Sequence, residues 1–191
     1  AIDSCTPYPY NPTLAKQLLT EAGYPNGFNI TLETTSGRYV YDKEVAQIAQ
    51  AQLAEVGINV NIRINEYSAH FSRLREPVAT YPQMAICGWG TSTGDPDYFI
   101  TQCYYSKVMP PLSLNPYYKN DAVDALIEQG ASETNITRRA EIYAQIQQLV
   151  WDDVPMIWLY TQPTVYAWIY NLHGVQIMPT GAINMRGAYI D

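Results

Sequence analysis

Charged residues are scarce in this sequence, and basic residues are scarcer than acidic ones. Only 15% of the 191 residues are charged, and 11 Lys and Arg stand against 18 Asp and Glu, which gives a formal net charge of −7. Because phosphate binding needs a basic face, this balance argues against nucleic acid as a partner. It argues equally against attachment to an anionic membrane surface.

Long apolar runs, clustered metal ligands and nucleophile motifs are missing too. No stretch approaches the roughly 18–20 apolar residues that span a bilayer. Ala1 to Cys5 do not resemble a signal peptide, so an exported protein is expected here in processed or shortened form. His70 and His173 lie far apart in the sequence and no Cys-x-x-Cys pair occurs, so the sequence contains no local zinc-binding motif. No Gly-x-Ser-x-Gly elbow is present either, and we assign no catalytic residue, no metal and no cofactor.

Three cysteines leave the disulfide pattern open. Cys87 ends the apolar run 84–87, which favours a buried thiol that packs as a small hydrophobic group. Cys5 and Cys103 lie in irregular Pro- and Tyr-rich stretches, where a bridge between them and two free thiols are both compatible with the sequence.

Apolar and aromatic residues are abundant, at 47% and 13% of the chain. Their periodicity predicts a mixed α/β fold with a sizeable core. We expect helices that begin at Pro12, near Asp42, after a cap at Ser68 and at Pro96, and two more over 121–130 and 137–151. We expect strands over 28–34, 58–64, 155–160 and 164–169, and within 81–90 a short buried strand that ends in a glycine-rich loop. The strand, long helix and strand between 28 and 64 predict a βαβ unit with parallel strands.

Asp95 and Asp97, which are separated only by Pro96, have two possible interpretations. They could form the carboxylate cradle of a metal-dependent transferase or hydrolase. Alternatively, Asp95 caps a helix that starts at Pro96, and Asp97 complements the helix dipole. The proline between the two acids favours capping.

Trp89 is poorly explained as a core residue. It stands between Gly88 and Gly90 at the exit of a predicted buried strand, ahead of a polar loop that contains Thr91 and Ser92. Ligands bind at the carboxyl ends of strands in open α/β sheets. The loop after the first strand, with Arg38 and Tyr39, would open on the same edge. We therefore predict ligand contacts at six positions: Arg38, Tyr39, Trp89, Thr91, Ser92 and Asp95.

Several segments together resemble the bacterial extracellular solute-binding proteins of family 5, the receptors for peptides, glutathione, opines and nickel in ABC importers. The similarity is collinear and covers essentially the whole chain. The segments that carry it include Tyr10-Asn11-Pro12, Glu21-Ala22-Gly23-Tyr24-Pro25-Asn26-Gly27-Phe28, Gly37-Arg38-Tyr39, Gln52-Leu53-Ala54-Glu55-Val56-Gly57-Ile58, Gly88-Trp89-Gly90, Asp95-Pro96-Asp97-Tyr98-Phe99 and Pro155-Met156-Ile157-Trp158-Leu159-Tyr160.

This resemblance implies a non-catalytic receptor that encloses a small-molecule or peptide-like solute between two lobes and delivers it to the membrane subunits of an ABC permease. It implies a periplasmic-binding-protein-like lobe of type II, cluster C-like, with a mixed sheet flanked by helices. Residues 1–160 correspond to the carboxyl-terminal lobe and residues 161–191 to a return segment, so the N-terminal lobe is expected outside this chain. The implied location is periplasmic or extracellular, with a lipid anchor as an option for the full-length form.

One departure from the family pattern concerns the ligand. The resemblance implies that peptide-binding members carry an Asp three residues after the tryptophan, where it pairs with the ammonium group of the peptide. That position is Ser92 here. Because a buried ammonium without a carboxylate is poorly compensated, ordinary peptides with free amino termini are disfavoured unless Asp95 or the other lobe supplies the charge. Arg38 would favour a solute that carries a carboxylate.

Overall fold

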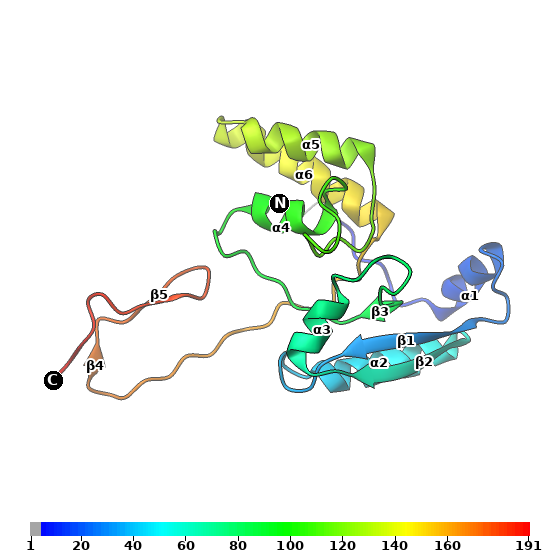
Figure 1. The fold of residues 1–191 in the computed structure, drawn as a ribbon, viewed down its shortest axis with the longest axis horizontal. Helices are drawn as coiled ribbons and strands as arrows, with labels where there is room; N and C mark the ends of the chain where they lie inside the picture. The colour runs from blue at the N-terminus through cyan, green and yellow to red at the C-terminus, as the bar shows by residue number, and fades with distance from the viewer. Residues whose placement is uncertain (1–4) are drawn as a thin grey trace.

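A computed structural model describes residues 5–191, which form two packed units and an extended carboxyl-terminal segment (Figure 1). The helices and strands follow one another in the order α1 (Pro12–Glu21), β1 (Phe28–Thr34), α2 (Asp42–Glu55), β2 (Ile58–Ile64), α3 (Tyr67–Arg73), β3 (Met84–Ala85), α4 (Pro96–Tyr104), α5 (Asp121–Ser132), α6 (Ile136–Asp153), β4 (Leu172–His173), β5 (Gln176–Ile177), β6 (Ile183–Asn184) and β7 (Tyr189–Ile190). The predicted α/β class is confirmed.

The first unit is the predicted βαβ motif. β1 and β2 pair in parallel over their whole length, from Phe28 opposite Ile58 to Thr34 opposite Ile64. α2 connects the two strands and packs on them around the buried side chains of Leu32, Ala46 and Val60. The short β3 joins the other side of β1, also in parallel, so the strand order is β2-β1-β3. All three strands therefore end at one edge of the sheet.

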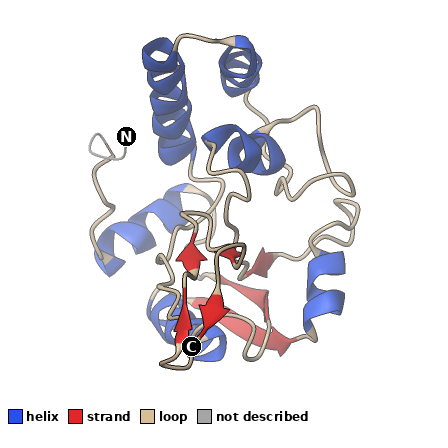
Figure 2. Cartoon of the chain, turned by 90° about the vertical axis from the view of Figure 1, so that its left-hand side faces the viewer, coloured by secondary structure: helices blue, strands red, loops and turns tan. Residues whose placement is uncertain are grey.

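The second unit is a helical layer formed by α4, α5 and α6, as Figure 2 shows from the side. The predicted helices over 121–130 and 137–151 are confirmed, and each is a few residues longer. Their apolar faces meet in a core separate from that of the sheet. The buried residues of this helical core are Ile100, Cys103, Tyr104, Val123, Ile127, Ile142, Tyr143, Ile146 and Val150.

Two helix starts behave differently from each other. α1 begins as predicted, with the side chain of Asn11 accepting a hydrogen bond from the amide of Leu14 at 2.9 Å. The predicted Ser68 cap of α3 is wrong. Glu66 caps this helix instead. Its carboxylate accepts hydrogen bonds from the amides of Ser68 and Ala69 in the first turn.

The short strand predicted within 81–90 is present, whereas the strands predicted over 155–160 and 164–169 are not. Only Met84–Ala85 pairs within the first of these segments. The other two predicted strands are wrong, because nothing in residues 5–191 lies beside them to complete a ladder. Met156 packs against the helical core, but most of the other apolar side chains are exposed, for example Val165 with 89% of its surface. The small antiparallel pairs β4–β7 and β5–β6 follow in the tail.

The cysteines are free throughout the described chain. Cys103 is buried in the helical core and Cys5 is half-buried, so they form no bridge. The prediction of a buried Cys87 is wrong, because this residue lies just beyond the end of β3, where the chain has left the sheet. No helix in this part of the chain has the length and apolar composition needed to cross a membrane.

Candidate functional site

The carboxyl edge of the sheet gathers the loops that follow β1, β2 and β3. Residues of the β1 and β2 loops line a hollow of about 360 Å³. The β3 loop meets the β1 loop where the ring of Tyr39 lies against Gly88. The predicted residues Arg38, Tyr39 and Trp89 therefore lie on the same edge. The hollow is lined by Thr35, Ser36, Gly37, Arg38, Asn65, Glu66 and Tyr67.

The buried carboxylate of Asp42 fixes the β1 loop from inside. Its Oδ2 accepts hydrogen bonds from Thr35 Oγ1 at 2.9 Å and from the amides of Arg38 and Tyr39 at 3.1 and 3.3 Å, while Oδ1 accepts from the amide of Gly37 at 3.1 Å. Burial by itself would raise the pKa of Asp42, but these bonds outweigh that effect and lower it. The β1 loop is thus a preformed turn that wraps around the carboxylate of Asp42.

Tyr39 connects this turn to the β3 loop. Its hydroxyl donates to the carbonyl of Gly88 at 3.4 Å, and its ring occupies the space that a side chain at position 88 would need. A Cβ atom at Gly88 would lie 2.5 Å from Cε1 of the tyrosine ring. Burial raises the pKa of Tyr39 to about 12, so this phenol is neutral at physiological pH and serves as a hydrogen-bond donor.

Arg38 is exposed and lies over two aromatic faces. Its guanidinium carbon is 5.1 Å from the centre of the Tyr39 ring and 4.6 Å from that of Tyr67. Such stacking restrains the long side chain while its N–H groups stay available, and a planar guanidinium pairs well with a carboxylate. The arrangement can therefore receive an anionic group at the rim of the hollow.

Trp89 is half-buried against two other rings. The Phe71 ring of α3 stacks with it at 6.3 Å and the Tyr98 ring of α4 at 6.2 Å, with interplanar angles of 4° and 13°. Its indole N–H is covered and finds no hydrogen-bond partner among residues 5–191. The tryptophan thus links the two packed units, because α3 belongs to the sheet side and α4 to the helical layer.

Two buried polar contacts hold α3 in place beneath Trp89. His70 Nε2 lies 2.9 Å from the carbonyl oxygen of Ile86, just before the β3 loop. Glu33, only 2% exposed, receives both Nε and Nη2 of Arg73, at 3.2 and 2.8 Å. Hydrogen bonds from Arg73 lower the pKa of Glu33 and keep it ionised.

In the polar loop after Trp89, Thr91 makes a hydrogen bond within the loop and Ser92 does not. Thr91 Oγ1 donates to the carbonyl of Asp95 at 2.9 Å and closes the loop on itself. Ser92 is exposed and makes no hydrogen bond within the described residues. Its hydroxyl is therefore accessible to a ligand.

Asp95 has a structural role at the start of α4. Its Oδ1 accepts from the amide of Asp97, which confirms the predicted cap, and both of its oxygens pair with Arg139 at 2.8 Å. These bonds, chiefly the one from Arg139, lower the pKa of Asp95. Asp97 in turn accepts from the hydroxyl of Tyr143 at 2.9 Å. Both carboxylates are thus engaged by protein donors, which argues against a shared metal.

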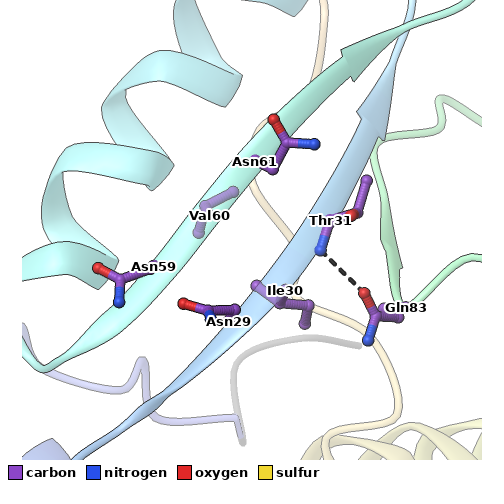
Figure 3. Close-up of a pocket in the computed structure, with 7 residues that line it drawn as sticks. All are labelled: Asn29, Ile30, Thr31, Asn59, Val60, Asn61 and Gln83. Atoms are coloured by element: carbon purple, nitrogen blue, oxygen red, sulfur yellow. Dashed lines mark hydrogen bonds between the residues drawn. The ribbon is translucent and has the colours of Figure 1, made fainter.

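A polar concavity of about 430 Å³ lies elsewhere, on the face of the sheet (Figure 3). Gln83 accepts from the amide of Thr31 there at 2.9 Å. None of the predicted ligand contacts borders this concavity, whose lining consists of Asn29, Ile30, Thr31, Asn59, Val60, Asn61 and Gln83. Across residues 5–191, no three His, Cys, Asp or Glu side chains come together as a metal site.

Sequence reasoning missed three aromatic residues of this region. Phe71 and Tyr98 flank Trp89, and Tyr67 carries Arg38. All three lie on helices that begin within a few residues of a strand end or a glycine loop. An aromatic residue in the first turns of such a helix is the signal that points to them.

The family description "Bacterial extracellular solute-binding proteins, family 5 Middle" matches residues 3–110 of this sequence. Among curated relatives, the glutathione-binding protein GsiB of Escherichia coli K12 is 31% identical over 188 residues. That alignment covers 97% of this chain and 36% of GsiB, so the chain spans about a third of the length of the relatives it matches.

Solved structures give a concordant result. The ABC transporter-associated periplasmic binding protein DppA of Helicobacter pylori, solved with the peptide STSA, is 32% identical with a TM-score of 0.74. The match covers 81% of this chain and 30% of DppA. The dipeptide-binding protein of Pseudoalteromonas sp. SM9913, solved with Met-Leu, is 24% identical with a TM-score of 0.77 over 95% of this chain and 36% of its own, a likeness in fold alone.

Proposed function

The chain belongs to the bacterial extracellular solute-binding proteins of family 5, and from that premise we propose that it forms one lobe of a receptor for a small solute. In this proposal, residues 1–160 are the ligand-binding lobe and residues 161–191 lead back toward an N-terminal lobe outside the chain. The receptor is periplasmic or extracellular and delivers its solute to an ABC permease. Its role is binding and release, not catalysis.

The observation that carries this proposal is the aromatic shelf at the carboxyl edge of the sheet, which consists of Arg38, Tyr39 and Trp89. Tyr39 and Trp89 come from loops far apart in the sequence, and the contact of Tyr39 with Gly88 brings them together. Of these three residues Arg38 lines the hollow of about 360 Å³, together with the ring of Tyr67, and concave sites lined by rings with a few polar groups are typical of small-molecule binding. A second lobe would close over this shelf and bury the solute between the two.

The solute we propose is peptide-like or another compound with a carboxylate or amide. Arg38 supplies a guanidinium for the carboxylate, and Ser92 and Thr91 supply hydroxyls beside Trp89. Asp95 pairs with Arg139 and leaves no free negative charge at its own position for a ligand ammonium. Glutathione is a suitable probe because GsiB is named for binding it, and its two carboxylates suit Arg38.

A titration by nuclear magnetic resonance tests the proposal. Isotope-labelled chain receives reduced glutathione up to millimolar concentration, because a single lobe binds weakly. We expect saturable shifts of the Trp89 indole and the Arg38 and Tyr39 amides, and loss of the two amide shifts in Trp89→Ala. Trp168→Ala, a tryptophan change in the exposed tail, is the matched control. Shifts spread over the surface, or equal in both variants, would refute this function.

A further inference from the structure

The segment that leaves α6 touches the β1 loop directly. The hydroxyl of Tyr160 donates to the carbonyl of Val40 at 2.6 Å, and Oε1 of Gln162 accepts from the amide of Val40 at 3.2 Å. Both backbone groups of one loop residue are thus held by side chains more than a hundred positions further along the chain. We call Tyr160, Gln162 and Val40 the exit clamp.

The clamp holds the part of the loop that Asp42 does not. Asp42 binds the amides of Gly37, Arg38 and Tyr39 from inside the turn. Val40 is exposed, and its backbone bonds within the described residues go only to Tyr160 and Gln162. It directly follows Tyr39 and precedes Tyr41, whose φ of +61° lies in the left-handed region that non-glycine residues seldom adopt. The clamp therefore fixes the strained end of the loop.

The exit segment is attached to the rest of the chain by side chains alone. Between 155 and 168 no backbone group bonds to the backbone of any described residue. The Trp158 ring stacks on Trp151 of α6 at 5.1 Å, and the clamp follows a few residues later. Beyond Gln162 the segment runs away from the packed units, as Figure 1 shows. A segment without ladder hydrogen bonds can shift while its side-chain contacts carry the displacement.

We propose that Tyr160 and Gln162 are positioning residues for ligand binding, which hold Val40 and thereby set Tyr39 and Arg38 on the aromatic shelf. This role rests on the proposed function. In a two-lobed receptor the exit segment is the covalent route from this lobe toward the other, so its movement on closure acts on the loop through the clamp. Ligand contact and lobe position are coupled at Val40.

The experiment uses the same labelled chain and measures amide hydrogen exchange at Val40 together with the dissociation constant for reduced glutathione. Gln162→Met removes the acceptor at similar size, Gln162→Glu keeps an acceptor oxygen, and Tyr160→Phe removes only the hydroxyl. Tyr170→Phe is the matched control, because Tyr170 is 98% exposed and makes no hydrogen bond in the described chain.

We expect Gln162→Met to speed exchange at Val40 about five- to tenfold, as loss of one hydrogen bond predicts. Gln162→Met and Tyr160→Phe should each weaken glutathione binding about threefold or more, while Gln162→Glu and Tyr170→Phe stay near wild type. Faster exchange without a change in affinity would overturn the positioning role, and so would equal weakening by Gln162→Met and Gln162→Glu. If the wild-type chain binds no glutathione, the proposed function fails and the positioning role fails with it, whereas the exchange rates still report on the contact.

Discussion

Replacing Asp42 with asparagine should unfold the β1 loop and weaken the whole chain. The carboxylate accepts from five donors, and an asparagine offers an acceptor at only one of its two terminal atoms. If its oxygen takes the Oδ2 position, the amides of Gly37 and Lys43 face an NH2 group. The opposite orientation loses three bonds instead of two.

The expected loss follows from these two bonds. A hydrogen bond to a charged group contributes about 1.5–3 kcal/mol, so Asp42→Asn should lower the free energy of unfolding by about 3–6 kcal/mol. This is a large part of the roughly 5–15 kcal/mol that stabilises a typical domain. Urea denaturation followed by circular dichroism measures it, with Asp121→Asn as control because that side chain is 90% exposed. The control should change stability by less than about 1 kcal/mol.

The pH dependence gives a second test of the same residue. Because the pKa of Asp42 is lowered in the folded chain, its stabilising effect is fully present above the pKa of an unfolded Asp, about 3.9. The effect is lost as the pH falls through the lower, folded value. Asp42→Asn should therefore remove part of the acid sensitivity that sets in below about pH 5, one unit above the unfolded value. A loss no larger than that of Asp121→Asn, with an unchanged pH profile, would refute the assigned role.

Three further changes test other contacts. Arg73→Met should cost about 1.5–3 kcal/mol of unfolding free energy in urea, because it removes charge-assisted hydrogen bonds from the buried Glu33 carboxylate, which keeps Arg63 and Asn65 as donors. Asp95→Asn should cost only about 1 kcal/mol, the pairing with Arg139, because Asn still caps the helix, and Asp95→Ala about 1 kcal/mol more. Trp158→Ala should abolish the exciton signal of two stacked indoles in the circular dichroism spectrum and cost about 0.5–1.5 kcal/mol.

Each of the three has its own control. Arg138→Met changes an arginine with 69% of its side chain exposed and should alter stability by less than about 1 kcal/mol. Equal losses for Asp95→Asn and Asp95→Ala would contradict the capping role. Trp168→Ala should leave the exciton signal unchanged, since the Trp168 ring stacks on no other aromatic ring among the described residues. A lost signal there would contradict the assignment to Trp151 and Trp158.

Sequence patterns predicted helix and strand positions correctly where contacts between neighbouring residues determine the structure. Asn11 before Pro12 and Asp95 before Pro96 each predicted a helix start, because capping depends on neighbours two or three residues away. The alternation over 58–64 predicted β2 for the same reason. The segments 155–160 and 164–169 are rich in the apolar and aromatic residues that favour strands, yet a strand also needs a hydrogen-bonded neighbour, and residues 5–191 provide none.

The site was predictable in part. Trp89 and Arg38 could be placed on one edge because parallel strands end together. The residues that contact Trp89 and Arg38 could not be predicted from the sequence. The stacking of Phe71 on Trp89, and the pairing of Asp95 with Arg139 across the helical layer, depend on how separately folded pieces pack. Sequence spacing holds no record of such contacts between distant segments.

The indole at position 89 stacks on one ring from α3 and one from α4 and so connects the two packed units, whose cores share no buried residue. The Phe71–Trp89–Tyr98 stack is a bridge between the units. A molecule bound at this bridge would stabilise both units together, by the free energy of its own binding. Occupancy would therefore raise the melting temperatures of the two units jointly.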